Sequence, residues 1–176
     1  MSPKVNEKAL VKQCIDQNRA AQRQLFLTYK DAMFTVLYRL LGNSEEAEEA
    51  LQDGFIKVFN HISSFEGKST LGAWMKTIFI REALQRLRKE SLQVNEISDI
   101  EDVSVLTFDD SLTGETLEKA ILSLEDGYRT VFLLIEVEGF KHNEVAKMLN
   151  ISEGTSKSQL SRAKLKLRTI LTDLGY

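Results

Sequence analysis

The chain has very little of several residue types that would mark other classes of protein. Its 176 residues include one cysteine, Cys14, and one proline, Pro3. A single cysteine cannot build a disulfide framework, which favours a reducing cytoplasm. No apolar run approaches the roughly 20 residues that cross a bilayer, and the N-terminal stretch MSPKVNEKALVKQC lacks the apolar core of a signal peptide. We therefore expect a cytoplasmic protein with no membrane span.

Residues that carry catalysis or hold metals are also scarce. No glycine-rich phosphate loop is present, and the two histidines, His61 and His142, stand 81 positions apart. Together with one cysteine they offer no zinc-ligand spacing. Acidic pairs occur on faces that we expect to be solvated, and no site for covalent or acid–base chemistry is evident. The sequence predicts a protein that is not an enzyme and needs no metal or cofactor.

What the chain does have is helical periodicity. Apolar residues recur every three or four positions, and no convincing alternating run of the strand type appears. Gly42 is placed to end a helix in a left-handed cap, and Asn43 with Ser44 to start the next one. We expect an all-α protein with helices at 7–17, 20–41, 45–61, 71–89, 116–124, 128–138, 142–149 and 153–172.

Charge divides the chain into three parts. Residues 91–115 hold seven acidic residues and no lysine or arginine, whereas the whole chain carries a net charge of only −3. The remainder is therefore basic, at +4. Because 91–115 also lacks a helical stripe, we interpret it as an acidic flexible linker. The sequence thus predicts two small helical domains, 1–90 and 116–176, joined by 91–115.

The C-terminal domain contains a candidate helix-turn-helix. Residues 139–168 hold seven Lys/Arg and two Glu, and two predicted helices flank the short turn NIS, with the small Ala146 where they cross. The second helix of such a motif suits the major groove of DNA. The residues expected to project together from it are Thr155, Lys157, Ser158, Gln159 and Arg162. On spacing alone, an ordinary amphipathic hairpin with a solvated basic face remains an alternative.

This stretch resembles region 4 of bacterial RNA polymerase sigma factors of the extracytoplasmic function type. The family core G-T-x-K-S-x-L-x-R-A is matched by GTSKSQLSRA at 154–163. The resemblance implies that the second helix reads the promoter −35 element. The sequence departs from the family at Lys141, where a Ser cap is usual, at Asn150 for the turn glycine, at Ser156 for Val, and at Gln159 for Arg. Of these, Gln159 bears on base preference rather than on the fold.

The helix predicted at 45–61 has two contrasting faces. Its buried stripe is expected to hold Ala47, Ala50, Leu51, Val58 and Ile62. The opposite face is acidic and includes an isoleucine; a lone exposed apolar residue is common, but one within an acidic face also suits a contact surface. The segment EEAEEALQDGFIKVF is similar to the family's region 2.2, which grips the clamp helices of the largest polymerase subunit. Glu49, Gln52, Asp53 and Phe55 fall on positions of the family motif. With the isoleucine of the acidic face added, core-polymerase binding is assigned to Glu49, Gln52, Asp53 and Ile56. Gly54, in the middle of this helix, has no explanation in the sequence.

Residues 65–89 combine six Lys/Arg with interleaved aromatic residues, a composition that suits single-stranded nucleic acid. The spacing of Trp74 from Leu71 and Ile78 favours Trp74 as a core residue. The stretch is similar to regions 2.3 and 2.4 of the family, which recognise and open the −10 element. The residues assigned to the −10 element are Phe65, Lys68, Ser69 and Arg81. Arg81 stands where the family usually has Asn.

The joint resemblance over about 25–90 and 116–171 implies a sigma factor whose partners are core polymerase and promoter DNA. The clamp helices would meet the N-terminal domain and the flap region would meet the C-terminal domain, and an anti-sigma protein is a further candidate partner. The alternative hypotheses are a stand-alone helix-turn-helix regulator that binds DNA as a dimer, and a helical adaptor that binds no nucleic acid.

Overall fold

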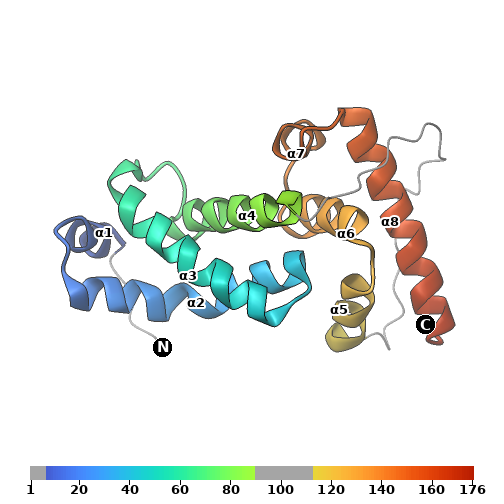
Figure 1. Ribbon diagram of the computed structural model, residues 1–176, viewed down its shortest axis with the longest axis horizontal. Helices are drawn as coiled ribbons and strands as arrows, with labels where there is room; N and C mark the ends of the chain where they lie inside the picture. The colour runs from blue at the N-terminus through green and yellow to red at the C-terminus, as the bar shows by residue number, and fades with distance from the viewer. Residues whose placement is uncertain (1–6, 90–112) are drawn as a thin grey trace. The chain divides into compact units, whose positions relative to one another are not determined.

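The computed structural model describes residues 7–89 and 113–176. Within these ranges every regular element is a helix, and the chain forms two compact units that divide after Arg86, in the last turns of α4. The predicted all-α, two-domain architecture is confirmed (Figure 1). Residues 91–112, which are most of the predicted linker 91–115, lie outside the described residues.

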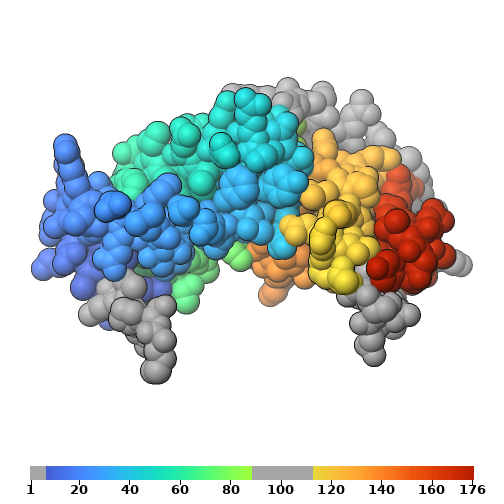
Figure 2. Space-filling view, turned by 90° about the horizontal axis from the view of Figure 1, so that it is seen from below, coloured from blue at the N-terminus to red at the C-terminus, as the bar shows by residue number. Residues whose placement is uncertain are grey.

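The first unit contains four α-helices and one short 3-10 turn. These are α1 (Glu7–Ile15), α2 (Arg19–Leu41), α3 (Ser44–His61), η1 (Ile62–Ser64) and α4 (Leu71–Lys89). Gly42 ends α2 at φ 73°, as predicted, and the Asn43 side chain accepts from the N–H groups of Glu45 and Glu46 to begin α3. These two caps set the tight reversal that lays α3 against α2. The outer surface of α2 (blue to light blue) covers much of this unit when it is viewed from below (Figure 2).

Aromatic rings fill the space between α2, α3 and α4. Phe55 lies 4.8 Å from Phe26, 6.1 Å from Phe59 and 5.1 Å from Phe79, measured between ring centroids. Phe79 is fully buried, as are Leu25 and Leu37 of α2. The predicted stripe of α3 needs one correction, because Phe55 is buried and Leu51 is only half-buried.

Gly54 of α3 allows α4 to approach closely. A Cβ atom at Gly54 would lie 2.2 Å from Cε1 and 2.4 Å from Cδ1 of Phe79, far inside van der Waals contact. The bare backbone of α3 therefore forms part of the pocket for the Phe79 ring. This close approach is the reason for a glycine that helix propensity alone disfavours by about 1 kcal/mol.

The second unit comprises α5 (Gly114–Leu122), α6 (Asp126–Phe132), the π-helical turn η2 (Leu133–Val137), α7 (His142–Leu149) and α8 (Glu153–Asp173). Its core consists of fully buried side chains on α6, η2, α7 and α8, which are Val131, Leu134, Val145, Ala163 and Leu167. Helix α5 begins two residues before the predicted start, because the Thr113 side chain accepts from the N–H of Thr116.

A buried arginine ties α5 to α6. Arg129 is 4% exposed, and its Nη1 donates to the carbonyl oxygens of Leu122 and Leu124 at 3.3 and 2.8 Å. Its Nη2 donates to Asp126 at 2.7 Å. The guanidinium thus satisfies carbonyl groups that the end of α5 leaves open.

Two findings concern what the described residues lack. No helix among them is both long and apolar enough to cross a membrane. No cluster of three or more His, Cys, Asp or Glu in the same ranges could hold a metal ion.

Candidate DNA-binding and polymerase-binding surfaces

Helices α7 and α8 form a helix-turn-helix. Asn150 adopts the left-handed conformation, φ 57° and ψ 48°, at the end of α7. Asparagine tolerates this conformation, so it replaces the usual turn glycine at little cost. The Ser152 hydroxyl then accepts from the N–H of Thr155 at 2.9 Å and starts α8. Ala146 is buried at the crossing, as predicted.

Of the five residues predicted to project from α8, three are at least partly exposed and two are buried. The side chain of Lys157 is 61% exposed and pairs with Glu153 at 3.0 Å, and Ser158 and Arg162 are partly exposed. Thr155 and Gln159, by contrast, are 7% and 3% exposed. The prediction that all five project together is therefore wrong for these two. They precede the buried Ala163 by eight and four positions, and so lie on the inner side of α8.

Ser156 forms a polar contact where the family usually has an apolar residue. It is fully buried, and its hydroxyl lies 2.9 Å from Nδ1 of His142, the first residue of α7. A buried hydroxyl is costly unless it is hydrogen-bonded, and this contact satisfies it. Burial is the main factor that lowers the pKa of His142, and Lys157 lowers it further. The contact joins the first residue of α7 to the first turn of α8.

The start of α7 uses a different cap from the one the family pattern suggests. Lys141 stands at the cap position, and its side chain has no acceptor atom. The Glu144 carboxylate instead accepts from the backbone N–H of Lys141 at 2.7 Å. The Lys141 side chain itself is exposed at the start of α7.

The predicted polymerase-binding residues share one exposed surface on α3. Glu49, Gln52 and Asp53 are exposed, and Ile56 is 58% exposed. We call this surface, Glu49, Gln52, Asp53 and Ile56, the acidic face. Ile56 follows Asp53 by three positions and Gln52 by four, so an exposed apolar side chain stands at the end of a run of acidic and polar residues on one face of α3.

An ion network beneath the acidic face is not evident from the sequence. Arg86 of α4 contacts Glu49, Asp53 and Glu82, and Lys57 of α3 also contacts Glu82. Glu82 is buried, with 7% of its side chain exposed. Because Arg86 stands 37 positions after Glu49, no local pattern could have predicted the contact.

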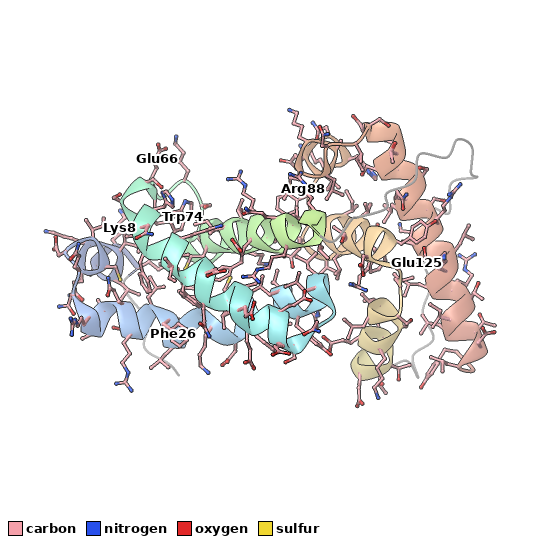
Figure 3. The ribbon with its side chains drawn as sticks, viewed as in Figure 1. Lys8, Phe26, Glu66, Trp74, Arg88 and Glu125 are labelled. Atoms are coloured by element: carbon pink, nitrogen blue, oxygen red, sulfur yellow. The ribbon has the colours of Figure 1, made fainter. Side chains whose placement is uncertain are left out.

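Three of the residues predicted to contact the −10 element, Phe65, Lys68 and Ser69, lie in the loop between η1 and α4. Arg81 lies on α4, ten positions after its first residue. The Phe65 ring lies 5.6 Å from that of Trp74, and both are only half-buried. Trp74 is therefore not the core residue predicted from its spacing, since Leu71, Met75 and Phe79 occupy the core side of α4. Figure 3 shows Glu66 on the loop and Trp74 in the first turn of α4.

Polar groups of the same loop are open to solvent. Lys68 has 85% of its side chain exposed and pairs with Glu66, and Ser69 is also exposed. Arg81, which belongs to α4, is exposed as well. Thr70 caps α4 by accepting from the N–H of Ala73 at 3.2 Å. On the other side, Glu7 of α1 lies 3.4 Å from the N–H of Leu71 and 3.3 Å from the hydroxyl of Tyr29. The Thr70 and Glu7 contacts hold the first turn of α4, and the exposed groups of the loop lie directly before it.

Two family models match the chain in the order that the sequence suggested. The model of sigma-70 region 2 matches residues 25–93, and that of sigma-70 region 4 matches residues 114–167. The first covers α3, the loop and α4, and the second covers the helix-turn-helix.

Whole-chain relatives agree with the two models. The chain is 28% identical to the ECF RNA polymerase sigma factor SigW of Bacillus subtilis, over 94% of this chain and 98% of that protein. It is also 28% identical to the sigma factor YlaC of the same organism, over 89% of this chain and 95% of that protein.

One similar solved structure is the sigma factor RpoE of Bartonella quintana, in complex with the anti-sigma factor NepR. It matches with a TM-score of 0.56 and 27% identity, over 85% of this chain and 96% of that one. The chain belongs to the extracytoplasmic function type of RNA polymerase sigma factors, the non-enzymatic subunits that direct promoter-specific initiation of transcription.

Proposed function

We propose that the acidic face of α3 binds the clamp helices of the largest subunit of core RNA polymerase. The exposure of Ile56 among Glu49, Gln52 and Asp53 carries this proposal. An exposed apolar residue beside acidic side chains fits a contact centre with a polar rim. The acids would attract a basic partner at long range, and Ile56 would be buried on contact.

The two other surfaces are assigned to promoter DNA. The loop 65–70 with Phe65, Lys68, Ser69 and Arg81 would hold the opened −10 element, since half-exposed rings stack on unpaired bases and cations meet phosphates. Helix α8 would meet the −35 element, with Thr155, Lys157, Ser158, Gln159 and Arg162 assigned by resemblance. The burial of Gln159 means that its side chain must become exposed if it is to read a base.

Further partners are proposed from the family resemblance and from one relative. The C-terminal unit would meet the flap region of polymerase, and the chain would act in the cytoplasm, where the polymerase works. RpoE of Bartonella quintana was solved with an anti-sigma factor, which supports a regulator of the same kind for this chain.

The test is to measure the affinity of the Ile56→Asp variant for core polymerase by fluorescence titration. The variant should lose at least about tenfold in affinity, because an apolar contact is replaced by a charge that must be desolvated. Ile15→Asp is the matched control: Ile15 is 45% exposed and lies on α1, outside the region 2 match. Wild-type affinity in Ile56→Asp would exclude the acidic face as the polymerase site.

A further inference from the structure

One guanidinium contacts three carboxylates from two helices of the first unit. Arg86 Nη1 lies 3.2 Å from Glu49 Oε2, and Nη2 donates to Asp53. Arg86 Nε lies 3.3 Å from Glu82 Oε1, one turn earlier on α4. Each nitrogen of the planar fork therefore has its own acceptor, a geometry that lysine cannot reproduce.

Burial increases steadily along this network. The exposed fraction of the side chain is 65% for Glu49 and 52% for Asp53, but 22% for Arg86 and 7% for Glu82. A buried carboxylate is stable only with well-placed partners, and Glu82 has both Arg86 and Lys57. The inner end of the network is consequently fixed, whereas its outer end faces solvent.

The carboxylates of Glu49 and Asp53 can accept further hydrogen bonds from a partner. A carboxylate offers about four acceptor positions, and Arg86 uses one oxygen each of Glu49 and Asp53. These acids stand four positions apart on α3, where like charges repel. A guanidinium held between them offsets that repulsion and restricts both side chains.

We propose that Arg86 is a positioning residue for the acidic face, and that buried Glu82 anchors it. This inference rests on the proposed function of the acidic face as the polymerase site. A basic partner would then meet two carboxylates that are already ordered, so less side-chain entropy is lost on binding. Arg86 and Glu82 act through Glu49 and Asp53 without touching the partner.

The experiment is a double-mutant cycle on core-polymerase affinity, measured by fluorescence titration with the full chain. Glu82→Gln is the informative variant, because a side chain this buried cannot itself meet polymerase. It should weaken binding about two- to fivefold, and Asp53→Asn should do the same in the wild-type background. In the Glu82→Gln background, Asp53→Asn should add less than about twofold, because Asp53 is no longer held in place.

Two further variants separate positioning from charge and from folding. Arg86→Lys keeps the charge but loses the fork, and should weaken binding as Glu82→Gln does. Glu48→Gln removes an exposed acid of α3 outside the network and is the matched control for charge. Thermal denaturation of each free variant identifies any loss that comes from unfolding.

Each alternative outcome has a definite meaning. Independent losses that multiply in the double variant would overturn the positioning role, as would unchanged affinity in both Glu82→Gln and Arg86→Lys. Tighter binding by Arg86→Gln would show that Arg86 competes with polymerase, and would also overturn it. If Ile56→Asp and Asp53→Asn both bind normally, the acidic face is not the polymerase site and the inference fails with it.

Discussion

At the scale of single residues, the pair formed by Gly54 and Phe79 shows how a local cost can support a long-range contact. The glycine weakens α3 by itself, yet its missing side chain is the space into which the ring of α4 fits. The ring also meets Phe55 edge-on at 5.1 Å and is fully buried.

Gly54→Ala should therefore destabilise the chain, although alanine is the better helix former. We expect a loss of about 1–3 kcal/mol in the free energy of unfolding, measured by urea denaturation, because the new methyl group overlaps a fully buried ring. Phe79→Leu in the Gly54→Ala background should recover part of the loss. A Gly54→Ala variant as stable as the wild type would contradict the close packing of α3 on α4.

His142 gives the C-terminal unit a predictable dependence on pH. Burial, Lys157 and Lys164 lower its pKa from the ordinary 6.5, while Glu153 and Glu136 act in the opposite direction. Because the folded pKa is the lower one, the unfolded chain takes up a proton first as the pH falls. The contribution of neutral His142 to the free energy of unfolding is fully present above about pH 6.5. It is lost as the pH falls from there to the folded pKa of His142.

The measurement is the free energy of unfolding as a function of pH. His142→Gln should reduce the loss of unfolding free energy between about pH 6.5 and the folded pKa of His142, because the residue that titrates there has been removed. A slope that His142→Gln leaves unchanged would rule out the titration of His142 as its source.

At the scale of secondary-structure elements, α8 offers a test of phosphate contact. Lys157→Ala should weaken binding to all DNA sequences alike and lower the slope of log affinity against log salt by about one, if its ammonium meets a phosphate. Lys119→Ala on α5 is a closely matched control. Both lysines are exposed and pair with a glutamate four positions earlier. Equal salt slopes for the two variants would argue against Lys157 as a DNA contact.

The loop between η1 and α4 is the second element that can be tested by itself. Lys68→Glu should impair open-complex formation on a duplex promoter, because it places a negative charge where phosphate is expected. A template premelted at the −10 element should restore part of the activity, since the unstacking cost of a few kcal/mol has already been met. Lys30→Glu, which changes a lysine paired with Asp31 in the same unit, is the control. Normal opening of the duplex by Lys68→Glu would remove the loop from the mechanism.

At the scale of the whole molecule, charge is divided among segments with different tasks. The acids of 91–115 would repel DNA phosphate, while the flanking units carry the positive charge. Replacing the seven acids by Ser or Asn should lower the yield of transcripts while leaving −35 binding by the C-terminal unit unchanged. By resemblance to the family, this segment would occupy a positively charged channel of polymerase. An undiminished transcript yield would show that these charges are dispensable.

The sequence by itself determined the parts of this protein that depend on neighbouring residues. Helix bounds came within a few positions of the structure, because caps such as Gly42 and Asn43 act within one or two turns. The helix-turn-helix and the exposure of Ile56 followed from periodicity for the same reason. The family resemblance, carried by motifs such as GTSKSQLSRA, was also contained in local sequence and was confirmed.

Only the tertiary structure decided which residues meet across helices. It explained Gly54, whose missing side chain leaves room for the ring of Phe79. It also paired Ser156 with His142, and it brought Arg86 into contact with Glu49 and Asp53. It also buried Gln159 and left Trp74 at the edge of the core, against the sequence prediction. A periodic pattern shows that a helix has an inner face, but the partner of each side chain depends on how distant helices pack, and that is set by the complementary shapes and charges of residues far apart in the chain.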